Sequence, residues 1–379
     1  MREARLVLAG VVMISVTHGV ARFAYGLFVP EFREEFGLSG GMLGVIGAGS
    51  YVSYCFGIAA SAILATSLGP RVVVVVAGFV AVSGMAVIAA AVAPWMLAVG
   101  VLGAGVSTGL SQPPLVDAVA RTLDPEKQDR AQAVINSGPG FGISLSGPVA
   151  LLAAGEWRSA WFAFVVIGVI ATVWNAFAIP DKERVQAADE PERLSASWLV
   201  RPGSAPLFAS AFAIGFSVSA YWTFSRDLVV QAGLSPFAST AFWVVIGVSG
   251  IVGAAAGDLV ARFGLRRVLP LTLLVTAAVT LLLALAPGSP IPVFGSAALF
   301  GAAYIVLTAL LLLWAVEVFR ERPSAGLAAA FLFLAVGQTL GSITSGVLAE
   351  QVGLGITFIA FAAAAAATAL IRPGSEIKA

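Results

Sequence analysis

The segment VVVVVAGFVAVSGMAVIAAAVA, residues 72–93, has 22 residues and no charged side chain. About 20 apolar residues in a helix are enough to cross the ~30 Å hydrocarbon core of a bilayer. A helix also satisfies its own backbone hydrogen bonds, which lipid cannot do. This stretch therefore predicts a membrane-spanning helix.

The rest of the chain has the same character. Of its 379 residues, 59% are hydrophobic and 11% are charged, and the mean hydropathy is +0.97. Soluble domains carry about 25% charged residues. The first apolar segment is too long for the core of a cleaved signal peptide, so we expect it to remain as a span. Twelve spans are predicted: 5–30, 41–66, 72–93, 95–119, 132–154, 158–179, 204–226, 236–260, 268–286, 291–318, 325–349 and 354–371.

The basic residues support this count and predict an orientation. If both termini are cytoplasmic, seventeen of the 21 lysines and arginines fall on the cytoplasmic side. Only Arg33, Arg158 and Arg226 fall on the other side, and Arg22 lies within a span. Cytoplasmic loops of membrane proteins carry such an excess of positive charge. We expect a multi-pass protein of the cytoplasmic (inner) membrane.

The longest polar stretch divides the spans equally. Residues 180–203 follow the sixth predicted span and read as a cytoplasmic linker. The motif GLS also recurs, at 37–39 and 233–235. We predict an all-α integral membrane protein of two pseudo-symmetric six-helix bundles, 1–179 and 204–379. Such internal repeats are typical of transporters that bind substrate near the membrane midplane, between the repeats.

A loop in the second half carries a family motif. The stretch GDLVARFGLRR, residues 257–267, resembles the loop motif G-x-x-x-D-R-x-G-R-R of the major facilitator superfamily (MFS), with Ala261 where that family usually has aspartate. The first-half counterpart at 62–71 keeps only Gly69 and Arg71. The matching residues of the second half are Gly257, Arg262, Gly264 and Arg266.

The fifth predicted span resembles another motif of that superfamily. NSGPGFGISLSGPV, residues 136–149, is similar to the glycine- and proline-rich fifth helix of its antiporter branches, above all at Gly147 and Pro148. The resemblance implies the MFS fold, transport by alternating access, and a gating role for the matched residues. It also implies that the first, fourth, seventh and tenth helices line a central cavity.

The first span carries the least expected residues. In THGVARFAYG, residues 17–26, an α-helix would place His18, Arg22 and Tyr25 on one face. A charge near mid-membrane costs at least ~2.5–3.5 kcal/mol, so it usually faces a cavity or a partner. We predict a site in which Arg22 binds an anion, Tyr25 donates a hydrogen bond and His18 carries a proton. Alternatively, Arg22 extends to the headgroups and His18 bonds a neighbouring helix.

Other spans supply weaker candidates for the same site. Ser217 and Tyr221 share a face of the seventh span, and we expect Tyr221 to face the first helix. Small polar residues also join helices without binding substrate. Gln112 in the fourth span and Tyr304 in the tenth complete the predicted set of substrate-binding residues.

The acidic residues avoid the middle of the membrane. Asp117 and Glu317 lie near span ends, four and three residues before Arg121 and Arg320. We predict local ion pairs or gate latches there. Because no carboxylate stands near the midplane of a predicted span, a cation exporter is disfavoured.

Several function classes lack their signatures. The sequence has no G-x-x-x-x-G-K-[ST] loop, so it does not use ATP directly. One histidine and one cysteine, Cys55, cannot build a zinc site, and no nucleophile motif surrounds His18. A net charge of +1 without a basic cluster argues against nucleic acid as partner. We expect no enzyme activity, metal or cofactor.

The sequence thus predicts a monomeric secondary active transporter. Its substrate is a small organic anion of the carboxylate type, moved with a proton. Efflux of drugs or other amphiphiles is the alternative within the same class. A membrane receptor that does not transport is the alternative of another class.

Overall fold

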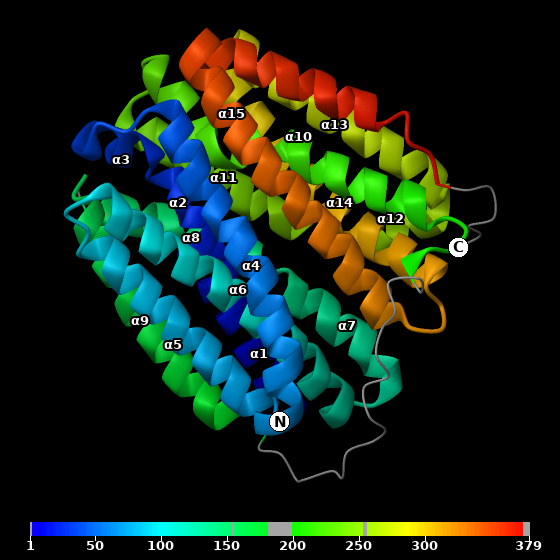
Figure 1. Ribbon diagram of the computed structural model, residues 1–379. Helices are drawn as coiled ribbons and strands as arrows, with labels where there is room; N and C mark the ends of the chain where they lie inside the picture. Colours follow the sequence, from blue (N-terminus) through cyan, green and yellow to red (C-terminus); the bar gives the residue numbers. More distant parts are fainter. Residues whose placement is uncertain (1, 154, 181–198, 253–255, 374–379) are drawn as a thin grey trace.

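In the computed structural model, residues 2–153, 155–180, 199–252 and 256–373 are described, and they form helices and no strand (Figure 1). The helices are α1 (Arg2–Ile14), η1 (Ser15–Phe23), α2 (Ala24–Leu27), α3 (Val29–Phe36), α4 (Gly40–Leu68), α5 (Pro70–Ala89), α6 (Pro94–Thr122), α7 (Pro125–Asn136), α8 (Gly138–Leu152), α9 (Trp157–Ala178), α10 (Ser204–Gln231), α11 (Pro236–Val252), α12 (Ala256–Phe263), α13 (Leu265–Leu285), α14 (Pro290–Val318) and α15 (Pro323–Thr368).

Each predicted span falls on helical residues, although the helices divide differently. Nine helices within the described ranges are long and apolar enough to cross a membrane, and α11 is a shorter apolar helix. The eleventh and twelfth predicted spans both lie on α15, which turns at Gly353 (φ 83°, ψ 161°). The fifth span is shared between α7 and α8. The eighth falls on α11 and α12, and residues 253–255 between them lie outside the described part.

The helices form two groups. Figure 1 shows α1 to α9 gathered on one side of the molecule and α10 to α15 on the other. Within the first group α6 packs on both α4 and α5, and within the second α15 packs on α10 and α13. Most of the predicted linker, 181–198, lies outside the described residues. The bundle boundaries therefore remain a prediction.

Polar contacts show which segments share an end of the molecule. Lys127 Nζ lies 3.2 Å from Glu3 Oε2, so α7 meets the start of α1 at one end, which we call the terminal end. At the opposite end, which we call the α3 end, Arg158 pairs with Glu35 at 2.5 Å. The hydrogen-bonded Arg158 guanidinium holds the pKa of Glu35 below its usual value.

Two crossed ion pairs join the groups at the α3 end. Arg226 Nη1 of α10 lies 2.6 Å from Glu31 Oε2 of α3, and Arg33 Nη2 of α3 lies 2.7 Å from Asp227 Oδ2 of α10. Arg226 also donates to the Leu27 carbonyl. The side chains of Arg226 and Asp227 are only 6% and 2% exposed. We call these four charged residues the clasp.

Glycines let helices of the two groups approach closely at the same end. A Cβ on Gly26 of α2 would overlap the Trp222 carbonyl oxygen of α10. Ser342 of α15 donates a 3.0 Å hydrogen bond to the Gly44 carbonyl of α4. Missing side chains bring backbones together in membrane helices, where dispersion contacts drive association. The α3 end is therefore closed.

Substitution Gly26→Ala tests this packing. The new methyl would push α2 from α10, and such overpacking typically costs ~1–3 kcal/mol. We expect the melting temperature of the protein in detergent to fall by several degrees. Gly295→Ala in α14, where nothing lies within 4 Å of a new Cβ, is the matched control and should be neutral or stabilising. Equal melting temperatures for both variants would contradict the close approach.

Substitution Asp227→Asn tests the clasp. It leaves Arg33 without its carboxylate, and loss of one partner of a buried pair costs up to ~3 kcal/mol where the other is partly exposed. We expect a Ser342→Cys reporter in a Cys55→Ser background to react with maleimide about tenfold faster. The charge-exchanged pair Arg33→Asp with Asp227→Arg should restore slow labelling. Unchanged labelling in Asp227→Asn would show that the clasp does not hold this end shut.

Candidate functional site

Arg22 lies on a π-helix, η1, where the sequence predicted a regular α-helix. Gly19 in this segment packs so closely on α8 that a Cβ would overlap the backbone of Gly142. The Thr17 hydroxyl donates a 3.0 Å bond to the Met13 carbonyl, and such side chains compete with the helix's own bonds. π-Helical turns are rare and occur often at functional sites. The π-helical winding therefore indicates that this part of the first span is a candidate functional site.

The Arg22 guanidinium lies among aromatic rings. Its Cζ is 4.7 Å from the ring centroid of Tyr51 and 4.6 Å from that of Tyr54, both on α4, and 5.5 Å from that of Phe23. Arg22 is 8% exposed. The side chain is thus held inside the protein rather than extended to a membrane surface. Cation–π contacts of this kind contribute about 0.5–2 kcal/mol each.

Arg22 has no acidic partner within the described ranges. The ion pairs of these residues leave it out, and none of its nitrogens donates a hydrogen bond to another described residue. Its Nε is buried without a partner. Buried charges are normally paired, because removing an ion from water costs several kcal/mol. The site therefore holds an uncompensated positive charge with free donors.

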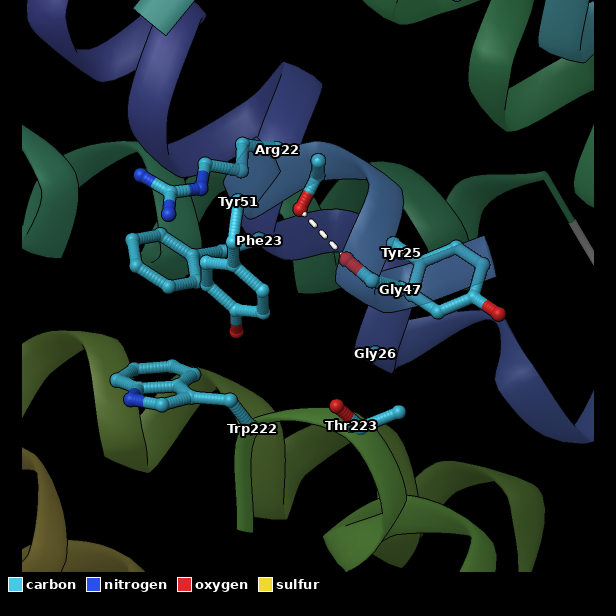
Figure 2. A pocket seen from close by; sticks show the side chains of 9 residues that line it. Arg22, Phe23, Tyr25, Gly26, Gly47, Tyr51, Trp222 and Thr223 are labelled. Atoms are coloured by element: carbon cyan, nitrogen blue, oxygen red, sulfur yellow. Dashed lines mark hydrogen bonds between the residues drawn. The ribbon is translucent and has the colours of Figure 1, made fainter. Parts of the chain in front are cut away.

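A small pocket, partly open to the outside, lies between the two groups. Figure 2 shows Arg22 and Tyr51 on one side of it and Trp222 of α10 on the other. Because side chains of both groups line it, movement of one group against the other must change its shape. The lining residues are Arg22, Phe23, Tyr25, Gly26, Gly47, Ser50, Tyr51, Trp222 and Thr223.

His18 lies on η1, one helical turn before Arg22, and its side chain is close to that of Gln112 on α6. His18 Nδ1 is 3.2 Å from the Thr17 hydroxyl, which lies 3.0 Å from the Ser111 hydroxyl of α6. The Gln112 side chain of α6 faces His18, and Arg22 is close enough for its charge to act on the imidazole. His18 is 8% exposed. The structure thus brings together three of the residues selected from the sequence.

Tyr25 differs from its predicted position. Its hydroxyl donates a 2.8 Å bond to the Leu43 carbonyl of α4, and its ring packs on Phe32 at 5.8 Å. Figure 2 shows the Tyr25 and Arg22 side chains extending in opposite directions. The expectation of a shared face assumed 100° per residue, which does not hold across the π-helical turn and the start of α2 at Ala24. Tyr25 still lines the pocket, at the side away from Arg22.

The prediction that Tyr221 faces the first helix is wrong. The Tyr221 ring stacks on that of Phe300, with ring centroids 3.6 Å apart, and its hydroxyl lies 2.8 Å from the Ser296 hydroxyl. Phe300 and Ser296 both belong to α14. Ser217 donates to the Ile214 carbonyl of its own helix. α10 is buried on nearly all sides at this level, so its sequence gives no apolar stripe that would fix its rotation.

Trp222, the next residue, takes the place expected for Tyr221. Its ring contacts Phe23 of the first group at 4.5 Å and Tyr304 of α14 at 4.9 Å. Tyr304, selected from the sequence, therefore borders the site, and Gln338 Nε2 of α15 donates to its hydroxyl at 3.5 Å. Trp222 was not among the residues selected from the sequence.

Tyr51 and Tyr54 were also missed. They are three residues apart on α4 and so share one helix face, which was a readable signal. The MFS resemblance pointed to other helices, and these residues lie on the second span. The long Arg22 side chain reaches from η1 to these two rings of α4.

The charged residues at the terminal end form local contacts. Arg121 Nε lies 2.7 Å from Asp117 Oδ1, and Arg320 pairs with Glu317. The prediction of local ion pairs is confirmed at both places. Neither acidic residue lines the pocket.

The residues matched to family motifs lie at a distance from the pocket. Gly264 adopts φ 77° just before α13, a conformation that favours glycine, and Arg262 lies 5.3 Å from the Phe263 ring. Arg266 is exposed, and the surroundings of Gly257 lie outside the described side chains. In α8, a Cβ on Gly147 would overlap Val244 of α11, whereas Pro148 is exposed. Gly147 therefore permits contact between the groups.

Comparisons with known proteins agree with this architecture. The family model described as "uncharacterised MFS-type transporter YbfB" matches residues 14–372. No curated protein matches the chain significantly. Among solved structures, a bacterial homologue of the human lysosomal transporter Spinster, in an inward-facing and unoccupied conformation, has a TM-score of 0.79 at 12% identity over 98% of this chain and 94% of its own.

The nucleoside transporter NupG is similar too. A point mutant of NupG has a TM-score of 0.77 at 13% identity, over 97% of this chain and 98% of its own. NupG itself has a TM-score of 0.73 at 14% identity, over 97% of both chains. At such identities the likeness shows the fold alone. The family match covers nearly the whole chain, which therefore belongs to the YbfB-type family of MFS transporters and is a multi-pass membrane protein rather than an enzyme.

Proposed function

We propose that this transporter moves a small organic anion of the carboxylate type across the cytoplasmic membrane, bound at Arg22 between two six-helix bundles, residues 1–179 and 204–379. The supporting observation is the buried guanidinium without an acidic partner in the described part of the chain. A carboxylate can accept two parallel hydrogen bonds from arginine and neutralise its charge. Binding would thus satisfy a donor, Arg22 Nε, that has no partner in the described part of the chain.

The charge of Arg22 supports an anion over the other substrate classes. A cationic drug would be repelled by Arg22, and a neutral molecule, such as the nucleosides for which NupG is named, would leave its charge uncompensated. No feature of the described residues favours a receptor without transport.

A proton accompanies the anion in this proposal. His18 is buried beside Arg22, and no carboxylate contacts it within the described ranges. Two adjacent positive charges repel strongly in a medium of low dielectric constant. An anion on Arg22 offsets that repulsion, so substrate and proton bind more favourably together than apart.

The predicted orientation of the chain places the closed α3 end on one side of the membrane. If both termini are cytoplasmic, the clasp lies on the outer side, which is then the closed side. Alternating access then requires the clasp to break and the terminal end to close, as the two bundles move about the pocket. We expect one chain to suffice, because both bundles that line the pocket belong to it.

Arg22→Gln tests the anion site. Removing one partner of a buried charge pair costs ~2–5 kcal/mol, so we expect carboxylate binding to weaken at least ~30-fold. Binding is measured by titration calorimetry on the detergent-solubilised protein, and uptake in proteoliposomes should fall in parallel. Arg22→Lys keeps the charge but loses the planar fork, and should be intermediate. Arg130→Gln, on the exposed face of α7, is the control. Equal carboxylate affinity in Arg22→Gln and the control would refute the site.

His18→Gln tests the coupling. We expect the wild-type protein to take up protons on binding the anion, so that affinity rises as pH falls. Calorimetry in buffers of different ionisation enthalpy measures that uptake. The variant should bind the anion with no proton uptake and a flat pH profile. If it takes up as many protons as the wild type, His18 is not the carrier.

A further inference from the structure

The aromatic rings around the pocket indicate what kind of group carries the carboxylate of the transported anion. This inference rests on the proposed function. Phe23 from the first group meets Trp222 from the second, with ring centroids 4.5 Å apart and planes inclined by 36°. The Tyr304 ring lies near both of these rings. Its centroid is 6.4 Å from that of Phe23 and 4.9 Å from that of Trp222. The contacts of Phe23 with Trp222 and Tyr304 cross between the groups, so they separate when the groups move. A planar apolar ligand could then replace them.

The polar atoms at the site are largely free donors. Trp222 Nε1 is buried without a partner, as is Arg22 Nε, and the Tyr51 hydroxyl makes no hydrogen bond within the described part of the chain. Trp222 itself is 4% exposed. An unsatisfied buried donor is unfavourable, so a ligand that supplies an acceptor there gains affinity.

The remaining polar side chains of the pocket already have partners. The Ser50 hydroxyl donates a 2.9 Å bond to the Gly47 carbonyl, drawn in Figure 2. The Thr223 hydroxyl lies 3.3 Å from that of Ser342. The site thus offers the charged donors of Arg22, one indole N–H, the Tyr51 hydroxyl and aromatic surface. That combination matches a flat acid with acceptors at two places rather than a short aliphatic acid.

We propose that the transported anion is an aromatic carboxylate with a second hydrogen-bond acceptor. Its carboxylate binds Arg22, its ring lies against Phe23, Trp222 and Tyr304, and its second acceptor takes the Trp222 N–H. Arg22 and Trp222 belong to different groups, so one ligand holds both halves of the site. An aliphatic acid reaches only the first of these contacts.

Matched ligands test each part by calorimetry on the full-length protein in detergent. Benzoate and cyclohexanecarboxylate share a carbon skeleton and differ in aromaticity, and we expect benzoate to bind about three- to tenfold tighter. The three ring isomers of acetylbenzoate are compared with the isopropylbenzoates, which have nearly the same shape and no acceptor. We expect at least one acetyl isomer to bind about tenfold tighter than its isopropyl counterpart.

The Trp222→Phe variant separates the ring from its N–H. It should keep the preference for benzoate over cyclohexanecarboxylate and lose the preference for the acetyl isomer. If pyruvate and cyclohexanecarboxylate bind as tightly as benzoate, and all three depend on Arg22, the aromatic assignment is wrong while the anion site stands. An acetyl preference that survives in Trp222→Phe overturns the role of the indole. If no carboxylate binds in an Arg22-dependent way, the proposed function itself fails.

Discussion

The site depends on one charged side chain that is kept away from water. Arg22 is buried among Tyr51, Tyr54 and Phe23, without a carboxylate in the described part of the chain. Aromatic faces recover part of the hydration that a guanidinium loses, but they do not neutralise it. In our proposal, the bound anion supplies the negative charge that the described residues around Arg22 lack. In the proposed mechanism, the protonation of His18 depends on whether the anion is bound to Arg22.

The local backbone structure and the packing of the two groups together determine the surroundings of Arg22. The π-helical winding of η1 aims Arg22 at the tyrosines of α4 while Tyr25 points the other way. The clasp and the glycine contacts hold the two groups together at the α3 end, which brings Trp222 against Phe23. The ligand site and the closed end are therefore mechanically linked. Separating the groups at the α3 end must disturb the pocket.

Hydropathy was enough to predict the helices, because every span must be apolar whatever its neighbours are. It also located Arg22 and His18, since a charge in an apolar run is conspicuous. Helix rotation was not predictable. α10 is buried on nearly all sides, so nothing in its sequence distinguishes the face of Tyr221 from that of Trp222. The π-helix was equally hidden, and the close contact of Gly19 with Gly142 of α8 joins segments that are far apart in the sequence.

A structure of the protein with a bound carboxylate would decide whether Arg22 is the anion site. We expect the carboxylate oxygens about 2.7–2.9 Å from the Arg22 nitrogens, in a two-bond arrangement between α4 and α10. An anion bound elsewhere with Arg22 still free would contradict this expectation, as would Arg22 paired to a carboxylate of the protein itself.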